Sequence, residues 1–157
     1  MFGNTKPAPP FQFSCPLFVE ELFGGLSENV HRALPAIIET RRFREGETIF
    51  ESGEIPEGIL RVVEGKAQLD YVSSPLGDTV TRPLKHGEIW GITELLAEAP
   101  LDISLRALTE TVVEIIPAAR FVQLVEEENE LCFRLLRLLS SRYLAEWAFL
   151  TTRSESG

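Results

Sequence analysis

The stretch from Thr40 to Pro117 restricts the possible folds most, because it consists of short runs that alternate apolar and polar residues. Within one run Ala67, Leu69 and Tyr71 are separated by polar residues, so a strand there would bury one face and expose the other. Glycine turns divide the runs, at positions 46, 53, 58, 65, 77 and 87. This pattern predicts an antiparallel sandwich or barrel.

Helical periodicity precedes the β-stretch. An apolar pattern that starts at Pro16 predicts a first short helix, and Ser27 is placed to cap a second one. Pro35 lies inside the second pattern, and a proline removes a backbone hydrogen bond and collides with the preceding turn. We therefore expect helices within residues 16–39, with a kink or break near Leu34.

Helical periodicity also follows the β-stretch, over residues 118–152. The acidic segment 126–130 divides it into a short helix and a long one, and a charge run in that place is typical of a solvated connection. Residues 1–14 contain prolines at positions 7, 9 and 10 and no periodicity. We predict a flexible tail at 1–14 and a single domain at 15–157.

The long helix is more apolar than one buried face requires. Apolar residues at steps of three and four define a stripe, and further apolar residues widen it. A helix of this kind packs against its own domain on one side and against a partner on another. We predict that it forms a homodimer seam through Cys132, Leu136, Leu139, Tyr143, Trp147 and Leu150.

Composition excludes several classes of function. The chain carries 24 acidic and 15 basic residues, a net charge of −9, which is the wrong sign for direct binding to a nucleic-acid backbone. The basic cluster at Arg41, Arg42 and Arg44 is interpreted as a solvated face. No apolar run reaches the ~18 residues of a membrane span, and Cys15 and Cys132 are too few for a disulfide framework. We expect a cytoplasmic protein that binds neither nucleic acid nor membrane.

Catalytic and metal-binding patterns are also missing. Only His31 and His86 are present, without a His-x-His pair, so the histidine cluster of a metal-dependent jelly-roll enzyme cannot form. The sequence contains no Walker loop, catalytic triad or dinucleotide fingerprint. We predict no catalytic residue, no metal and no enzymatic activity.

Four segments in order resemble the cyclic-nucleotide-binding domain of the Crp/Fnr regulator family. They read LFGGLSENVHRAL, RRFREGETIFESGEIPEGILRVVEGKAQL, HGEIWGITELLAEAP and LRALTETVVEIIPAARFVQLVEEENELCFRLLRLLSSR, and they lie between residues 22 and 142. The resemblance implies a mainly β protein: a β jelly roll (double-stranded β-helix) at 40–117 with N-terminal helices and a long C-terminal dimerisation helix. Since few residues follow that helix, we expect a stand-alone sensor without the helix-turn-helix domain.

The resemblance also implies a phosphate-binding cassette, from which this chain departs. In the family a Phe-Gly-Glu turn is followed, about nine residues after the glutamate, by arginine and serine; the glutamate binds the ribose and the arginine binds the cyclic phosphate. Here Trp90 and Gly91 keep the turn, but Ile92 replaces the glutamate and Leu101 the arginine. The candidate ligand-binding positions are Gly91, Ile92, Thr93, Leu101, Asp102 and Ile103.

Other residues could contribute to a ligand site. Arg106 has strand parity opposite to Ile103 and Leu105, so we expect it to point away from the pocket and pair with surface carboxylates. Glu146 and Trp147 lie near the level at which the family's long helix contacts the base; Trp147 could stack on a flat ligand or anchor the dimer, and we favour the anchor.

Three functions remain open after the sequence analysis. The first is a regulatory module with a degenerate cassette, acting through homodimerisation and contacts with a protein partner. The second is a true small-molecule receptor, for a cyclic nucleotide in an altered pose or for another metabolite. The third is a structural scaffold. Binding of a cyclic nucleotide in the family's usual manner is not expected, and no cofactor is predicted.

Overall fold

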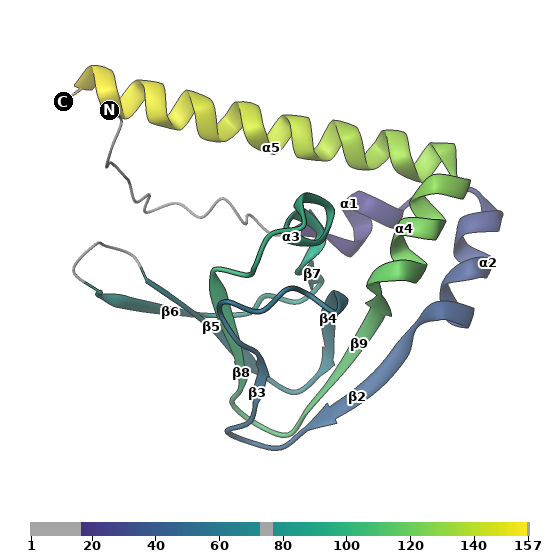
Figure 1. Cartoon of the computed structure of the whole chain (residues 1–157), viewed down its shortest axis with the longest axis horizontal. Coiled ribbons are helices and arrows are strands. Elements are labelled where there is room, and N and C mark those ends of the chain that lie inside the picture. Colours follow the sequence, from purple (N-terminus) through teal and green to yellow (C-terminus); the bar gives the residue numbers. More distant parts are fainter. Residues whose placement is uncertain (1–16, 73–76, 157) are drawn as a thin grey trace.

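Antiparallel strands form the body of the protein, and helices cover one end of it (Figure 1). The computed structural model describes residues 17–72 and 77–156. Within those residues the elements are β1 (Leu17–Phe18), α1 (Val19–Phe23), α2 (Glu28–Ile37), β2 (Glu39–Phe43), β3 (Thr48–Phe50), β4 (Gly58–Glu64), β5 (Ala67–Val72), β6 (Thr79–Pro83), β7 (Glu88–Ile89), α3 (Ile92–Ala97), β8 (Ile103–Ala107), β9 (Thr111–Pro117), α4 (Ala118–Glu127) and α5 (Asn129–Ser156).

The strands are arranged in two main sheets and one short pair. The sheets have the orders β2-β9-β4 and β3-β8-β5-β6, and β1 pairs with β7. An isolated bridge between Leu60 and Trp90 connects the short pair to β4. All pairings are antiparallel, as the alternating sequence pattern predicts.

Alternation along β8 sets its orientation in the roll. Ile103, Leu105 and Ala107 are buried, whereas Arg106 is exposed and forms an ion pair of 3.5 Å with Asp70. The expectation that Arg106 points outward and pairs with a surface carboxylate is confirmed. The side-chain period of two explains this, because residues at odd and even positions of a strand lie on opposite faces.

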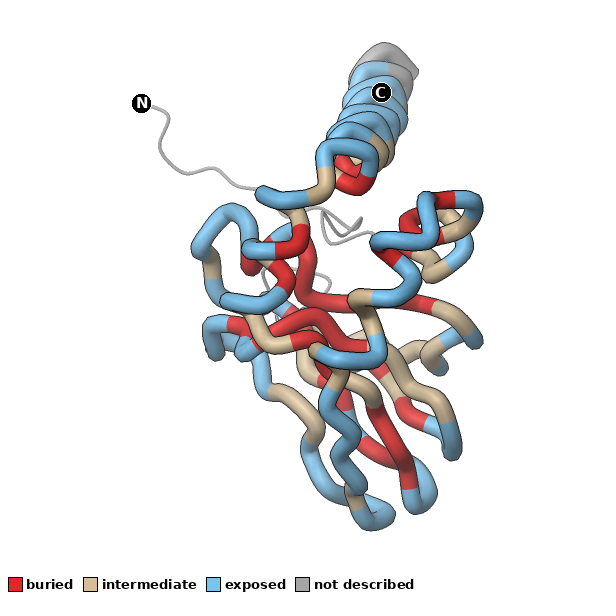
Figure 2. The backbone as a smooth tube through the Cα atoms, turned by 90° about the vertical axis from the view of Figure 1, so that its right-hand side faces the viewer, coloured by how far each residue is buried: buried red, intermediate tan, exposed pale blue. Residues whose placement is uncertain are grey.

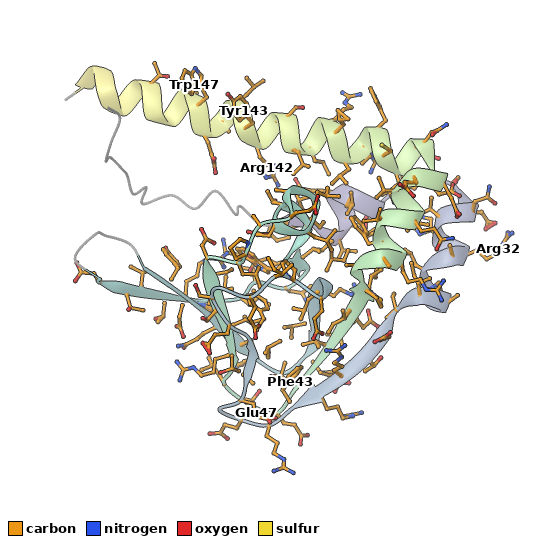
Figure 3. All side chains as sticks on the ribbon, in the orientation of Figure 1. Arg32, Phe43, Glu47, Arg142, Tyr143 and Trp147 are labelled. Carbon is orange, nitrogen blue, oxygen red and sulfur yellow. The ribbon has the colours of Figure 1, made fainter. Side chains whose placement is uncertain are left out.

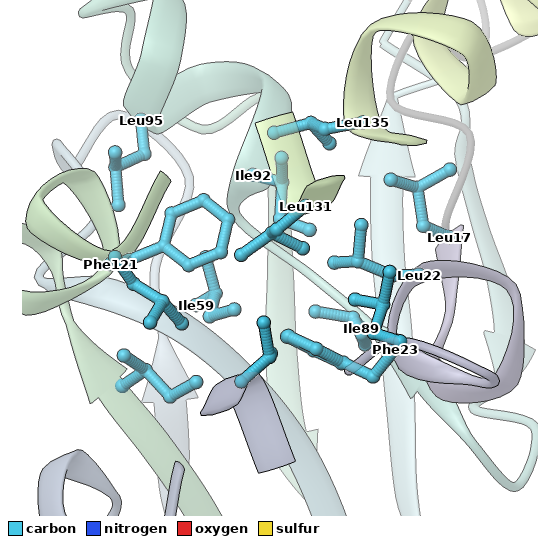
Figure 4. Packing of buried hydrophobic residues seen from close by; sticks show 14 residues of the cluster. Leu17, Leu22, Phe23, Ile59, Ile89, Ile92, Leu95, Phe121, Leu131 and Leu135 are labelled. Carbon is cyan, nitrogen blue, oxygen red and sulfur yellow. The ribbon is translucent and has the colours of Figure 1, made fainter. Parts of the chain in front are cut away.

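Two apolar cores hold the molecule together. One lies between the two main sheets and includes Leu69, Trp90, Ile103 and Leu105. The other, called the helix-side core below, lies where the helices meet β4, β7 and β9. Figure 4 shows its side chains converging from helices and strands. Figure 2 shows buried residues concentrated along the strands and at this junction. The helices therefore close one end of the roll.

The long helix α5 is attached to this end through its first half. Leu131 and Leu135 are buried in the helix-side core. Arg134 donates a hydrogen bond of 3.0 Å to the carbonyl of Glu21, and Arg142 donates one of 2.6 Å to the carboxylate of the same residue. Figure 1 shows α5 running across α1, α3 and α4 and continuing beyond them.

Three local features differ from the sequence-based expectation. Pro35 does not break α2: the helix runs to Ile37, and Ile38 still donates to the Leu34 carbonyl at 3.1 Å. Ser27 is the N-cap of α2 but makes no side-chain capping bond. The acidic connection between the terminal helices shortens to Glu128, since α4 and α5 both extend into the predicted gap. Residues 1–14 and Cys15 lie outside the described residues.

Candidate functional site

A cavity of about 450 Å³ lies in the roll beside the strand break at Trp90 and Gly91. It is bounded by β2, β3, β4 and β9, by the loop between β3 and β4, and by the end of the cassette. Its volume falls in the range of small-molecule pockets. The lining residues are Arg41, Phe43, Ile49, Phe50, Glu54, Ile55, Pro56, Glu57, Gly58, Leu60, Trp90, Gly91, Leu101 and Ile115.

A second and smaller cavity, of about 170 Å³, lies between α1, α2 and the sheet of β4 and β9. Its walls include Phe23, Leu34 and Ile116, and none of the predicted cassette residues line it. The larger cavity, which two of those residues do line, is therefore the candidate ligand site.

Gly91 makes the sharp turn that starts the cassette. Its φ of 101° is left-handed, a conformation that favours glycine. A Cβ at this position would lie 2.8 Å from the Gly58 carbonyl oxygen, so the close approach of the two chain segments also requires glycine. The turn lets α3 begin at Ile92 directly after the strand.

The cassette residues separate into different environments. Gly91 and Leu101 line the larger cavity. Ile92 is 3% exposed and packs in the helix-side core, while Thr93 and Asp102 are exposed. Ile103 is 1% exposed and packs in the core between the sheets. The structure thus brings two of the six predicted positions to the cavity.

Leu101 occupies the place where the family resemblance expects an arginine. Its side chain is 4% exposed and its backbone is fixed to the loop before β4, donating to the Glu54 carbonyl at 2.8 Å and accepting from Gly53 at 2.7 Å. An isobutyl group in this position presents an apolar surface to the cavity. It offers no hydrogen bond and no charge to a phosphate.

The charged side chains that line the cavity are one arginine and two glutamates. Arg41 donates a hydrogen bond of 2.7 Å to Glu57, and it lies 3.7 Å from the carboxylate of Glu39. The hydrogen bond to Glu57 raises the pKa of Arg41 above its ordinary value. Glu54 is the second carboxylate of the lining, and its Oε1 accepts a bond of 3.0 Å from the Glu51 amide. The lining therefore carries no excess of positive charge.

The positions of Arg41, Glu54 and Glu57 at the cavity were not predicted from the sequence. The basic cluster was interpreted as a solvated face, and Arg41 is indeed partly exposed, at 44% of its side chain. The alternation of β2 placed Arg41 and Phe43 on one face, which is a signal that both could line one surface. No sequence signal links them to Glu57, because the loop before β4 brings that residue across the sheet edge.

Trp90 forms a buried wall of the cavity. Its ring is 4% exposed, and its indole Nε1 has no hydrogen-bond partner among the described residues. The guanidinium of Arg82 lies 6.0 Å from the ring centroid. Arg82 also binds the buried carboxylate of Glu88 through two nitrogens, at 2.7 and 3.1 Å, and the Lys85 amide donates to the same carboxylate. The ion pair of Arg82 and Glu88 therefore covers one face of the Trp90 ring.

The predicted residues on α5 lie apart from the cavity. Glu146 is half-buried and Trp147 is 59% exposed, and neither lines the cavity. Figure 3 shows Tyr143 and Trp147 pointing away from the roll. Within one chain, then, Trp147 is not placed to stack on a ligand in this cavity.

The residues of the predicted dimer seam differ in their exposure. Leu136, Tyr143 and Trp147 are more than half exposed, whereas Leu139 packs against the helix-side core and Cys132 is half-buried. The side chain of Leu150 lies outside the described residues. The apolar face that α5 leaves exposed, called the α5 stripe below, consists of Phe133, Leu136, Tyr143, Leu144 and Trp147.

The described part of the chain holds neither a cluster of metal ligands nor a membrane-spanning helix. Among the side chains that the structure describes, no three from histidine, cysteine, aspartate and glutamate are grouped so as to hold a metal ion. In that part of the chain, too, no helix is long and apolar enough to span a bilayer. His86 is exposed in the turn before β7.

An antiparallel roll that encloses a cavity beside a short inserted helix, and that ends in a long helix, defines a β jelly-roll domain with flanking helices. The family model of the cyclic nucleotide-binding domain matches residues 40–128, more than half of the chain. The protein belongs to this family. The predictions of a β jelly roll and of a cyclic nucleotide-binding domain are thereby confirmed. No curated protein sequence matches the chain.

Solved structures agree on the fold. The catabolite activator protein of Thermus thermophilus superimposes with a TM-score of 0.73 at 24% identity, over 85% of this chain and 63% of that one. The N-terminal domain of a transcriptional regulator from Streptomyces coelicolor gives 0.66 at 24%, over 80% and 89%. The sensor domain of the regulator DNR from Pseudomonas aeruginosa gives 0.69 at 15%, over 82% and 86%. The chain therefore spans less than two thirds of the activator protein and most of the two isolated domains.

Proposed function

We propose that the protein is a regulatory module whose cassette no longer holds a cyclic phosphate, and whose output passes through homodimerisation and contacts with a protein partner. The observation that carries the proposal is Leu101, which presents an apolar group to the cavity where the family resemblance expects a cation. Arg41, the arginine of the lining, is already paired with the carboxylates of Glu57 and Glu39, which offset its charge.

The missing cation has a large energetic effect. Truncating one partner of a buried, hydrogen-bonded charge pair costs about 2–5 kcal/mol, which corresponds to a loss of roughly 10² to 10³ or more in affinity. The carboxylates of Glu54 and Glu57 line the same cavity and repel an anion. Both effects act against a cyclic nucleotide.

A physical path links the cassette to α5. Leu17 of β1 pairs with Ile89 of β7, directly before the cassette turn, and β1 continues into α1. Glu21 of α1 accepts hydrogen bonds from α5, including one from Arg142. We propose that a change at the cassette moves α1 and that these bonds transfer the movement to α5.

Calorimetric titration with cyclic AMP and cyclic GMP tests the degenerate cassette. The wild-type protein is expected to give no binding heat at micromolar nucleotide. The variant Leu101→Arg/Asp102→Ser is expected to bind cyclic AMP at least about 10-fold more tightly than wild type, because the arginine restores a charge-assisted hydrogen bond. Leu101→Met, which keeps the volume without a charge, is the control. Micromolar binding by wild type, or equal gains in both variants, would contradict the proposal.

A second candidate function is a receptor for a ligand other than a cyclic nucleotide. The cavity supports it, because its volume of about 450 Å³ lies in the range typical of small-molecule sites. In this form of the proposal the module keeps its regulatory role and only the signal differs.

A further inference from the structure

We infer that the smaller cavity, between α1, α2 and the sheet of β4 and β9, is a second ligand site for a compact, uncharged and apolar molecule. The expected ligand is about the size of one aromatic ring. The site is separate from the larger cavity, so the inference goes beyond the proposed function and does not depend on it. The apolar walls, the paired or exposed polar groups of the lining and the volume all support it.

The walls of the smaller cavity are apolar. Eight of its thirteen lining residues have aliphatic or aromatic side chains, among them Phe23, Leu34, Ile59 and Ile116. Phe23, Ile59 and Ile116 are buried in the helix-side core, so packing fixes their positions, and Leu34 of α2 is half-buried against the same core. Water between walls of this kind finds few hydrogen-bond partners, so an apolar ligand that replaces it is favoured.

The sheet supplies both an apolar wall of the cavity and its polar edge. Ile59 and Ile116 are register partners on β4 and β9, and Arg61 and Glu114 are the partners two residues further along. All four lie on the same face of the sheet, because a strand returns to one face at every second residue. Arg61 donates to one oxygen of Glu114 through two nitrogens, at 2.9 and 2.7 Å. The apolar part of the sheet therefore ends at an ion pair.

The polar side chains of the lining do not call for a charged ligand. Glu20 and His31 are exposed, and the charges of Arg61 and Glu114 offset each other. In the described part of the chain, none of these four side chains has a buried polar atom without a partner. A charged or strongly polar ligand would lose its hydration here without gaining matched hydrogen bonds, so an uncharged and apolar one is favoured.

The volume of the cavity sets the size of the ligand. About 170 Å³ lies below the range of drug-sized sites, which begins at roughly 300 Å³. An apolar cavity of roughly 150 Å³ engineered into another protein binds benzene. A single ring therefore matches the available space.

The smaller cavity lies beside the contact between α1 and α5. Val19 and Phe23 of α1 line it, and Glu21, between them in sequence, accepts the hydrogen bond of 2.6 Å from Arg142. A ligand in this cavity would touch the helix that is bound to α5, at a place that contains no residue of the predicted cassette.

The test uses the full chain and fluorobenzene, whose binding is followed by the broadening of its ¹⁹F NMR signal. The unchanged protein is expected to bind it with a dissociation constant of about 1 mM or tighter. The matched probe is 5-fluorouracil, a single uncharged ring that is polar, and it is expected to bind at least about 10-fold more weakly.

The location of the site is read from the amide signals of the unchanged protein in ¹H–¹⁵N spectra. Fluorobenzene is expected to shift the signals of Val19, Leu34 and Ile116, which line the smaller cavity. The signal of Leu101, which lines the larger cavity, is expected to stay in place. This measurement needs no variant, so it decides the question even if a substitution in the cavity wall prevents folding.

Two tryptophan substitutions in α2 form a matched pair. Leu34→Trp enlarges a side chain of the cavity wall and is expected to weaken fluorobenzene binding at least about 10-fold. Ile37→Trp, the control, places the same side chain at a half-buried position of α2 that does not line the cavity, and binding is expected to stay unchanged. Circular dichroism checks the fold of both variants.

The inference is supported by amide shifts around the smaller cavity, together with weaker binding in Leu34→Trp and not in Ile37→Trp. It is overturned if fluorobenzene does not bind, if 5-fluorouracil binds equally well, if the amide shifts surround Leu101, or if a folded Leu34→Trp binds like the unchanged protein. None of these results changes the expected response to cyclic AMP, so the proposed function stands or falls separately.

Discussion

The unchanged protein is expected to sediment as a dimer, and the double variant Leu136→Asp/Trp147→Asp as a monomer at the same concentration. Both residues belong to the α5 stripe, with 56% and 59% of their surface exposed in the single chain. Five large apolar side chains on one exposed helix face are typical of a surface that a partner covers. A second copy of the chain offers a matching face by symmetry.

The expected effect on the dimer is large. A large apolar side chain contributes roughly 1.5–3 kcal/mol when it becomes buried. A symmetric dimer would bury both positions in each protomer, so four charged replacements are expected to weaken association by at least about 10⁴-fold. Leu139 is the less suitable target, although the sequence pattern places it in the seam. It packs against the helix-side core, and a charge there would also destabilise the monomer.

The control is Ser141→Asp/Ala145→Asp. It adds the same charge to the same helix at two exposed positions, which lie about 60° and 100° around the helix from Leu144, the nearest residue of the α5 stripe. Its sedimentation is expected to match that of the unchanged protein. Equal masses for all three proteins would show that the stripe is not the dimer contact. Assemblies larger than a dimer, lost in the stripe variant, would instead favour the structural scaffold.

Arg82→Ala is expected to lower the free energy of unfolding by about 3–5 kcal/mol. Glu88 has a fully buried side chain, and Arg82 is its cationic partner at 2.7 Å. Removal of the arginine leaves a carboxylate buried without its counter-charge, held only by the Lys85 amide among the contacts described. Removal of the arginine also exposes one face of the Trp90 ring.

Urea denaturation measures the change in the free energy of unfolding. It is done in the Leu136→Asp/Trp147→Asp background, because the unfolding of a monomer does not depend on protein concentration. Arg32→Ala is the matched control. Arg32 pairs with Glu28 at 3.6 Å, but the two side chains are 74% and 85% exposed, and Figure 3 shows Arg32 pointing into solvent. The expected loss there is about 0.2–1 kcal/mol at most.

The variant Arg82→Met/Glu88→Leu tests the cause. Replacing both charges by apolar groups of similar size removes the desolvated carboxylate, so most of the stability lost in Arg82→Ala is expected to return. A double variant as unstable as Arg82→Ala would mean that packing around the Trp90 ring, and not the unpaired charge of Glu88, accounts for the loss.

The sequence predicted the fold well because its signals are local. Alternation in β8 is visible as Ile103, Leu105 and Ala107, and it assigned Arg106 to the outer face correctly. The helical period after Pro117 predicted two terminal helices, and their boundary was misplaced only by the length of the acidic connection. The effect of Pro35 was overestimated, since α2 continues past it to Ile37.

The candidate site was predictable only in part. The cassette residues follow one another in sequence, so their departures from the family could be read directly, and Gly91 and Leu101 line the cavity. Ile92 and Thr93 also follow in sequence, yet one turn of α3 sends Ile92 into the core and leaves Thr93 exposed. A helix rotates each residue by about 100°, so neighbours in the cassette do not share a surface.

The sequence by itself determined the class of fold, the turn at Gly91 and the loss of a cation at Leu101, since periodicity, glycine and residue identity are properties of short segments. Only the tertiary structure decided which charges and donors meet at the cavity. Arg41 lies on β2 and Glu57 in the loop before β4, while Arg82 lies on β6 and Trp90 directly after β7, and their contacts exist because the roll brings separate segments together. Pairing across such distances, and the unpaired indole it leaves, depends on the packing of the whole chain.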